Sequence, residues 1–176
     1  MAITSVTTSE TQRAGRRKAR IVLTTFGSLG DLHPYIAIAL ELKARGHEAI
    51  VATSGVYRAK IEALGIGFRA VRPDLPDPDS NSALIRRLMD RRLGTECVLR
   101  EMVIPVLRES YDDTFAAAEG ADLLVSHSLT FTTRMVAEKK GIPWASTILQ
   151  PMVFLSVYDP PVLPLMPMSG RRMRDS

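Results

Sequence analysis

The sequence has 176 residues, 45% of them hydrophobic, and carries a formal net charge of +4. This length and composition fit one α/β domain with its own core, and so small a charge does not argue for nucleic-acid binding, for which the sequence has no typical motif. No apolar run is long enough to span a bilayer, and the single Cys97 excludes an internal disulfide. We therefore expect a cytoplasmic protein, because an unpaired cysteine fits a reducing compartment.

The N-terminal stretch 1–19 has no hydrophobic periodicity, so we predict a disordered tail there. The apolar run Ile21–Leu23 that follows is too short for the hydrophobic part of a signal peptide. The tail is rich in Ser, Thr and Arg and poor in acidic residues, so its composition also fits a transit peptide.

Residues 21–46 hold the most informative pattern, which is a strand, a glycine turn and an amphipathic helix. The apolar run Ile21–Thr25 predicts the strand, and Gly27 permits the turn. Pro34 suits the first turn of a helix, so we predict a helix that begins near Pro34 and stops at Gly46. In an open α/β sheet, the loop between such a strand and helix lies at the carboxyl edge, where ligands bind.

Two titratable residues, Asp31 and His33, lie in this loop and make it a candidate site. The loop is not a P-loop, because no Gly-Lys-Ser/Thr follows the glycines. Its glycines are spaced G-x-x-G, so it does not match the dinucleotide fingerprint either.

Strand and helix patterns alternate along the rest of the chain, which predicts βαβ units and an α/β fold with a Rossmann-like parallel sheet flanked by helices. Further strands are predicted at 47–53, 68–71, 122–126 and 144–149. Helices are predicted at 56–64, 83–92, 95–118 and 130–140, with a kink at Pro105.

Two segments, GSLGDLHPYIAIALELKARGHEAIVAT and ADLLVSHSLTFTTRMVAEKKGIPWASTILQP (121–151), resemble the N-terminal domain of GT-B glycosyltransferases. The resemblance is to glycosyltransferase families 1 and 28, which include sterol and antibiotic glycosyltransferases. The matching residues of the first segment are Gly27, Ser28, Gly30, Asp31, Pro34, Gly46, His47 and Glu48. The resemblance implies the N-terminal half of a GT-B fold, with an acceptor-binding domain at 20–165 and a C-terminal tail at 166–176.

The resemblance implies the acceptor-binding half of an inverting transferase, which moves a hexose from a nucleotide sugar to a hydroxyl of a lipid, a sterol or another apolar small molecule. It implies no metal and no cofactor beyond the nucleotide-sugar donor. The family's donor-binding domain does not follow before Ser176. We expect a half-enzyme with little activity alone, which needs a donor-binding domain or subunit in trans.

Asp31 and His127 are the catalytic candidates. In the resembling family, the residue at the position of Asp31 is the general base that takes the proton of the acceptor hydroxyl. The alternative is that Asp31 only caps the following helix. His127 follows a predicted strand and would pair with Asp31, since the family places an acid–histidine pair across these two loops. The alternative for His127 is a histidine that only lines the acceptor cleft.

The resemblance also supplies candidate substrate-binding residues, which are Ser28, Gly30, His33, Ser128 and Gln150. An ordinary surface position is the alternative for His33. His47 opens the second strand at the opposite end of the sheet, and we interpret it as structural.

The helical pair 83–118 is expected to shape the acceptor site. Its first half carries Arg86, Arg87, Arg91 and Arg92 beside apolar residues, which fits either contact with a membrane surface or a solvated basic face. Apolar residues near the C-terminus fit either an acceptor wall or cover for the core; they are Met152, Phe154, Met166 and Met168.

Two other functions stay open. One is a non-catalytic subunit of a split glycosyltransferase that recruits the acceptor or a membrane. The other is an unrelated nucleotide-binding Rossmann protein, which Asp31 disfavours because it places a carboxylate where a phosphate would bind.

Overall fold

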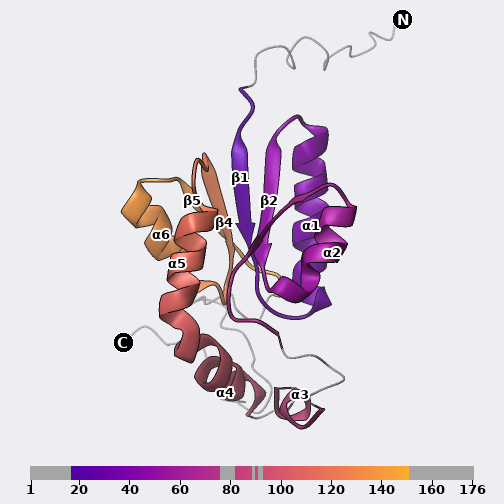
Figure 1. The fold of residues 1–176 in the computed structure, drawn as a ribbon, viewed down its shortest axis with the longest axis vertical. Coiled ribbons are helices and arrows are strands. Elements are labelled where there is room, and N and C mark those ends of the chain that lie inside the picture. Colours follow the sequence, from indigo (N-terminus) through magenta and orange to yellow (C-terminus); the bar gives the residue numbers. More distant parts are fainter. Residues whose placement is uncertain (1–16, 76–81, 89, 91–92, 151–176) are drawn as a thin grey trace, which may run out of the picture.

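Five strands of the described residues form one sheet in which all neighbouring strands are parallel (Figure 1). The structure is a computed structural model and describes residues 17–75, 82–88, 90 and 93–150. The strands are β1 (Arg20–Thr24), β2 (Glu48–Thr53), β3 (Gly67–Ala70), β4 (Leu123–His127) and β5 (Trp144–Thr147). Their spatial order is β3-β2-β1-β4-β5, so the direction of progression reverses between β1 and β4. The predicted Rossmann-like parallel sheet is confirmed, with small shifts at the strand ends.

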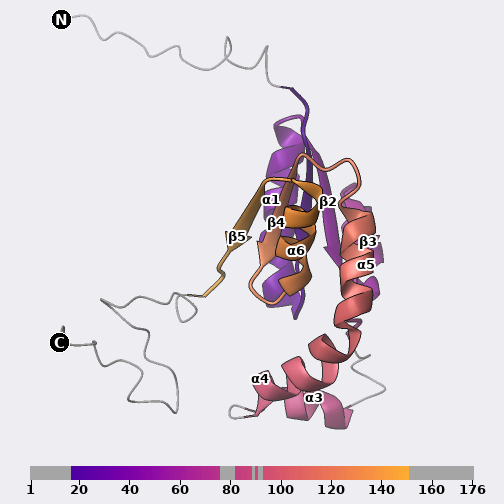
Figure 2. The same ribbon diagram turned by 90° about the vertical axis from the view of Figure 1, so that its left-hand side faces the viewer.

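Helices cover both faces of this sheet (Figures 1 and 2). One face carries α1 (Leu29–Ala44) and α2 (Arg58–Ala63), and the other carries α5 (Leu107–Ala117) and α6 (Phe131–Lys140). Successive strand residues point to opposite faces, so β1, β2 and β4 each contribute to two separate cores. In β1, for example, Leu23 packs with α1 residues while Val22 packs with α5 and α6 residues.

The first helix begins earlier than predicted. Its N-cap is Ser28, and Pro34 lies inside the helix instead of in its first turn. The physical reason is a capping box, in which the side chains of Ser28 and Asp31 satisfy the free N–H groups of the helix start. The end of the helix is as predicted, because Gly46 takes a left-handed conformation with φ of 87°.

The helical stretch between β3 and β4 is less regular than predicted. It contains α3 (Ser82–Leu88), α4 (Gly94–Cys97), a π-helical turn η2 (Val98–Val103), a 3₁₀ turn η3 (Ile104–Val106) and then α5. The predicted break at Pro105 is confirmed, since this residue lies in the 3₁₀ turn. Another 3₁₀ turn, η1 (Gly55–Tyr57), precedes α2. Figures 1 and 2 place α3 and α4 beyond the carboxyl ends of the strands.

Four predictions reach beyond the described residues. The end of the acceptor domain at 165 and the tail 166–176 lie outside them, as does most of the predicted tail 1–19. The Met152, Phe154, Met166 and Met168 wall lies outside them as well. None of the helices in the described part combines the length and the hydrophobicity that crossing a bilayer requires.

Candidate active site

The carboxyl ends of β1 and β4 lie side by side, because these two strands pair in the middle of the sheet. Asp31 is in the first turn of the helix that follows β1, and His127 is the last residue of β4. The two side chains face each other across the gap, with 3.7 Å between His127 Nε2 and Asp31 Oδ1. The structure therefore brings the two catalytic candidates together at the carboxyl edge, and their role in catalysis stays a prediction.

The two carboxylate oxygens of Asp31 have different partners. Oδ2 accepts hydrogen bonds from the backbone N–H of Ser28 at 2.8 Å and from its hydroxyl at 3.0 Å. Oδ1 is the oxygen that faces His127. Helix capping and a role in the site are therefore compatible, because each uses a different oxygen. The side chain of Asp31 is 30% exposed, so a ligand can reach it.

Gly27 leaves space for the Asp31 carboxylate because it has no side chain. The φ angle of Gly27 is +132°, which favours glycine. A Cβ atom at this position would lie 2.3 Å from Asp31 Oδ2, well inside the closest contact that two such atoms tolerate. The carbonyl of Gly27 accepts a hydrogen bond from the Tyr57 hydroxyl at 3.0 Å, which holds the turn against η1. Gly27 and Tyr57 were missing from the predicted site residues, although the glycine spacing was a signal for the former.

His127 is a buried and neutral imidazole. Only 3% of its side chain is exposed, and its Nδ1 accepts a hydrogen bond from the backbone N–H of Leu129 at 3.4 Å. This contact leaves the proton on Nε2, the nitrogen that faces Asp31. Burial lowers the pKa of His127, and the nearby charge of Asp31 raises it by a smaller amount. His127 is thus suited to donate a hydrogen bond toward Asp31 at neutral pH.

The other predicted site residues have different surroundings. Ser28 and Gly30 are exposed at the start of α1, next to the Asp31 carboxylate, and Ser128 follows His127 directly. His33 and Gln150 are exposed, and among the described contacts neither has a hydrogen bond or ion pair with the catalytic candidates.

His47 lies at the opposite end of the sheet, as predicted, just before β2. Its Nδ1 accepts a hydrogen bond from the backbone N–H of Ala19 at 3.2 Å, which ties the chain entering β1 to the turn entering β2. This is a structural contact.

A cavity of about 270 Å³ adjoins His127 between the ends of β4 and β5 and the start of α6. Three apolar side chains at its border are partly exposed, with 48% for Phe131, 38% for Trp144 and 36% for Ile148. The Trp144 indole N–H donates to the Ser126 hydroxyl at 2.9 Å, which fixes the ring. This apolar border was missed in the sequence, where its three residues do not form a periodic pattern.

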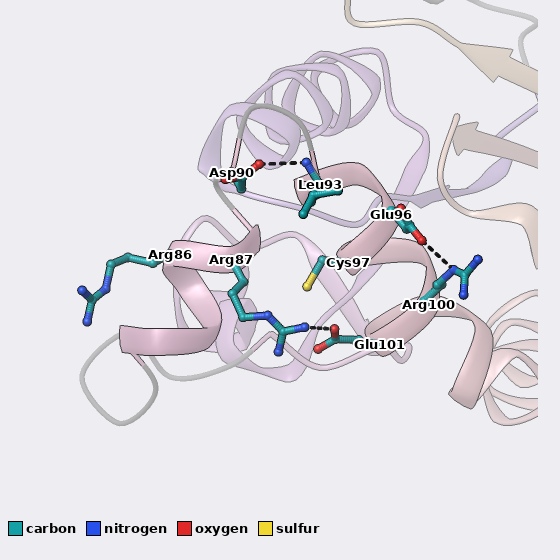
Figure 3. A pocket seen from close by; sticks show the side chains of 8 residues that line it. All are labelled: Arg86, Arg87, Asp90, Leu93, Glu96, Cys97, Arg100 and Glu101. Carbon is teal, nitrogen blue, oxygen red and sulfur yellow. Dashed lines mark hydrogen bonds and ion pairs between the residues drawn. The ribbon is translucent and has the colours of Figure 1, made fainter.

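A second hollow of about 400 Å³ lies among α3, α4 and η2 (Figure 3). Its charges are paired: Arg87 binds Glu101, and Arg100 binds Glu96 at 3.0 Å. Of the predicted basic residues, Arg86 and Arg87 are exposed, whereas Arg91 and Arg92 lie outside the described residues. The ion pair with Glu101 neutralises Arg87 of this basic face.

The helical region also contacts the two site loops. A small third core joins Phe26 of the first loop with Met102 and Val103 of η2, and Leu129 of the second loop packs against it. The segment between β3 and α5 therefore lies against the loops that carry Asp31 and His127. Cys97 of this region is buried, and burial raises the pKa of its thiol, so it is not an activated nucleophile.

No group of three or more His, Cys, Asp or Glu side chains that could hold a metal ion is found within the described part of the chain. The candidate site is thus a carboxylate and an imidazole beside an apolar border, and it can accept a proton from a neutral hydroxyl group.

The known proteins that are similar to this chain are all glycosyltransferases. Residues 21–158 match the glycosyltransferase family 28 N-terminal domain. The chain is 33% identical over 134 residues to the O-mycaminosyltylonolide 6-deoxyallosyltransferase of Streptomyces fradiae, a match that covers 72% of this chain and 30% of that enzyme. It is 30% identical over 142 residues to the sterol 3-beta-glucosyltransferase of Cryptococcus neoformans var. neoformans serotype D, which covers 79% of this chain and 9% of that enzyme.

Solved structures agree with this result. The glycosyltransferase SsfS6 of Streptomyces sp. SF2575 superposes with a TM-score of 0.55 at 25% identity, covering 73% of this chain and 38% of that one. The chain thus spans less than half the length of each of these relatives. The resemblance inferred from the sequence and the N-terminal half of a GT-B fold are both confirmed. The chain belongs to glycosyltransferase family 28, and residues 21–158 are its N-terminal domain.

Proposed function

We propose that this chain is the acceptor-binding part of an inverting glycosyltransferase that moves a hexose from a nucleotide sugar to a hydroxyl of an apolar small molecule, a sterol or another lipid. The observation that carries the proposal is the contact between Asp31 and His127 at the carboxyl edge of the sheet, with Asp31 open to a ligand. The proposed acceptor-binding domain is 20–165.

In the proposed reaction, Asp31 Oδ1 takes the proton of the acceptor hydroxyl while that oxygen attacks the anomeric carbon of the sugar. The new carbon–oxygen bond forms as the bond to the nucleoside diphosphate breaks on the opposite side, which inverts the configuration. Neutral His127 donates its Nε2–H toward the same carboxylate and orients it. Both groups act at short range, so geometry decides their efficiency.

The apolar border of Phe131, Trp144 and Ile148 supports an apolar acceptor, because it would bury part of such a molecule next to His127. The names of the two curated relatives are consistent with this, since one acts on a sterol and the other on a tylonolide. For the donor, the SsfS6 glycosyltransferase is known in complex with thymidine diphosphate.

We further propose that residues outside this chain bind most of the donor, either in a longer protein or in a partner subunit. The alternative is a non-catalytic subunit that recruits the acceptor or a membrane surface. The exposed side chains of Arg86 and Leu93 at the end of the helical region would favour contact with an anionic membrane. Turnover by the chain, once it is supplied with a donor-binding domain, distinguishes the two.

The test joins the chain to the donor-binding domain of a family member and measures glucosyl transfer to a sterol and the configuration of the product. Asp31→Asn keeps the size of the side chain but cannot take a proton, so we expect turnover to fall by about 10²–10⁴-fold. As a cap change it costs only about 1 kcal/mol of stability. His127→Ala should reduce turnover less.

The matched control is Asp112→Asn, the same change at an exposed residue of α5. Its turnover should equal that of the parent. Normal turnover in Asp31→Asn, or a retained anomeric configuration, would show that the proposed mechanism is wrong.

A further inference from the structure

Tyr35 is the largest fully buried side chain near the candidate site. It is 0% exposed and lies one helical turn after Asp31 on α1, so both residues project from the same side of the helix. Its ring meets the imidazole of His127 edge to face, with centroids 6.2 Å apart and an interplanar angle of 84°. One face of α1 thus presents a carboxylate and an aromatic ring to the same histidine.

The hydroxyl of Tyr35 is anchored in a defined direction. It is hydrogen-bonded to the hydroxyl of Thr147 on β5, and Thr147 donates its only hydroxyl hydrogen to the carbonyl of Ser126 at 2.9 Å. Tyr35 must therefore be the donor to Thr147, because a carbonyl oxygen can only accept. This series of hydrogen bonds runs from Tyr35 on α1 through Thr147 on β5 to the carbonyl of Ser126, the residue before His127. Burial raises the pKa of Tyr35, so its hydroxyl keeps the proton that it donates to Thr147.

The imidazole needs such a support, because its hydrogen bond to Leu129 is long and Asp31 lies beyond hydrogen-bond distance. The contact from Leu129 N–H to Nδ1 is 3.4 Å long, and the distance from Nε2 to Asp31 Oδ1 is 3.7 Å. Asp31, in contrast, is held by two shorter hydrogen bonds from Ser28. The ring of Tyr35 packs edge to face against the imidazole, so it is suited to limit the rotation of that ring.

We propose that Tyr35 is a positioning residue of the site, which acts through His127 by holding its imidazole with Nε2 toward Asp31. The importance of this role for glycosyl transfer rests on the proposed function. The placement of the imidazole does not, and it can be measured in the chain without donor or acceptor.

The experiment records ¹⁵N imidazole signals of His127 by NMR in the full chain, since these signals report which ring nitrogen carries the proton. The parent should show one tautomer with the proton on Nε2. Tyr35→Phe keeps the ring and should keep this signature, whereas Tyr35→Leu should give a mixture of tautomers. Tyr111→Leu, on the other face of the sheet, is the matched control and should leave the signature unchanged.

A second variant covers the case in which Tyr35→Leu does not fold. Thr147→Val leaves the Tyr35 hydroxyl buried without its acceptor, so the ring should shift and the His127 signature should change. The double variant Tyr35→Phe with Thr147→Val removes that hydroxyl and should restore the signature. If the double variant does not show the parental His127 signature, Thr147 acts directly on His127, its cross-strand neighbour, and the proposal is wrong.

In the transferase that is joined to a donor-binding domain, Tyr35→Leu should lower kcat by about 10²-fold with little change in KM, as expected for a misplaced catalytic pair. Tyr35→Phe should restore most of kcat. An unchanged His127 signature in folded Tyr35→Leu overturns the positioning role, whatever the activity. A changed signature with unchanged kcat keeps that role and instead counts against the proposed function of His127.

Discussion

The turn that leads from β1 into α1 and to Asp31 lies at the same end of the sheet as the helical region of α3, α4, η2 and η3, but the two are held in different ways. In the loop, neighbours in sequence satisfy one another: Ser28 caps the helix and fixes the carboxylate, and Gly27 makes room for it. In the helical region, the backbone changes its hydrogen-bonding pattern from α to π to 3₁₀ within Gly94–Val106. This region contacts the site loops through a small apolar core.

This difference in local contacts indicates which region tolerates substitutions. A locally satisfied loop holds its geometry to a fraction of an ångström, as catalysis requires. A region held by a few apolar contacts and exposed ion pairs can adopt a new shape at low cost in free energy. We therefore expect changes in the turn before Asp31 to displace its carboxylate, and changes in the helical region to leave the geometry of Asp31 and His127 unchanged.

Gly27→Ala should have the largest effect. The new methyl group would overlap Asp31 Oδ2, so the carboxylate must leave its place. In the chain joined to a donor-binding domain, turnover should fall by about 10²–10⁴-fold, as for loss of the base itself. The strained backbone should also cost about 1–3 kcal/mol of unfolding free energy. Steady-state kinetics and urea denaturation measure the two effects, and parental turnover would mean that Asp31 is not needed where the structure places it.

Gly94→Ala makes the corresponding change in the helical region. Its Cβ atom would lie 2.4 Å from the backbone carbonyl oxygen of Leu88, which cannot swing away as a side chain does. We expect α3 and α4 to separate, with a loss of about 1–3 kcal/mol in urea denaturation. The NMR signature of His127 should not change. A changed signature would show that the two regions are coupled, against the comparison above.

The buried imidazole gives the site a pH dependence of stability. Because burial lowers the pKa of His127 below its unfolded value of about 6.5, the unfolded chain takes up a proton that the folded chain refuses. The contribution of His127 to stability is thus present above about pH 6.5 and is lost as the pH falls toward its folded pKa.

His127→Gln should therefore lose less stability than the parent between about pH 7.5 and 5.5. Urea midpoints across this range measure the difference, and His33→Gln controls for the loss of one imidazole at an exposed position. Equal pH slopes in parent and His127→Gln would contradict the neutral, buried imidazole.

Arg100→Gln should have the smallest effect. Its ion pair with Glu96 spans one helical turn, with the two side chains 75% and 55% exposed. Such a pair contributes about 0.3–0.5 kcal/mol, so a double-mutant cycle with Glu96→Gln is needed to resolve it. A coupling well above 1 kcal/mol would show that electrostatics, and not the apolar core, hold the helical region.

The sequence predicted the sheet because its signals are short-range. Apolar strand runs, glycine stops such as Gly46 and the alternation of strands with helices are properties of a few neighbouring residues, and all five strands were found. The start of α1 differs from the prediction because Pro34 favours a start near its own position, whereas the helix begins at the cap six residues earlier. The capping box of Ser28 and Asp31 is also present in the sequence, and it determines where the helix begins.

The proximity of Asp31 and His127 was predictable, because both follow strands that reach the same edge. The partners of His127 were not. Tyr35 and Thr147 are 112 positions apart in sequence and meet through packing of α1 on β5. The cavity border of Phe131, Trp144 and Ile148 likewise exists only because β4, β5 and α6 converge. Such contacts depend on register and tertiary packing, which single-sequence patterns do not contain.

The reversal of strand order between β1 and β4 has a consequence for how such enzymes diversify. From β1 the chain leaves through α1 toward β2, and from β4 it leaves through α6 toward β5, so neither connection passes over the catalytic pair. The segment between β3 and α5 joins neither of these two connections. Under the proposed function, we expect that exchange of this segment changes acceptor preference and leaves proton removal by Asp31 in place.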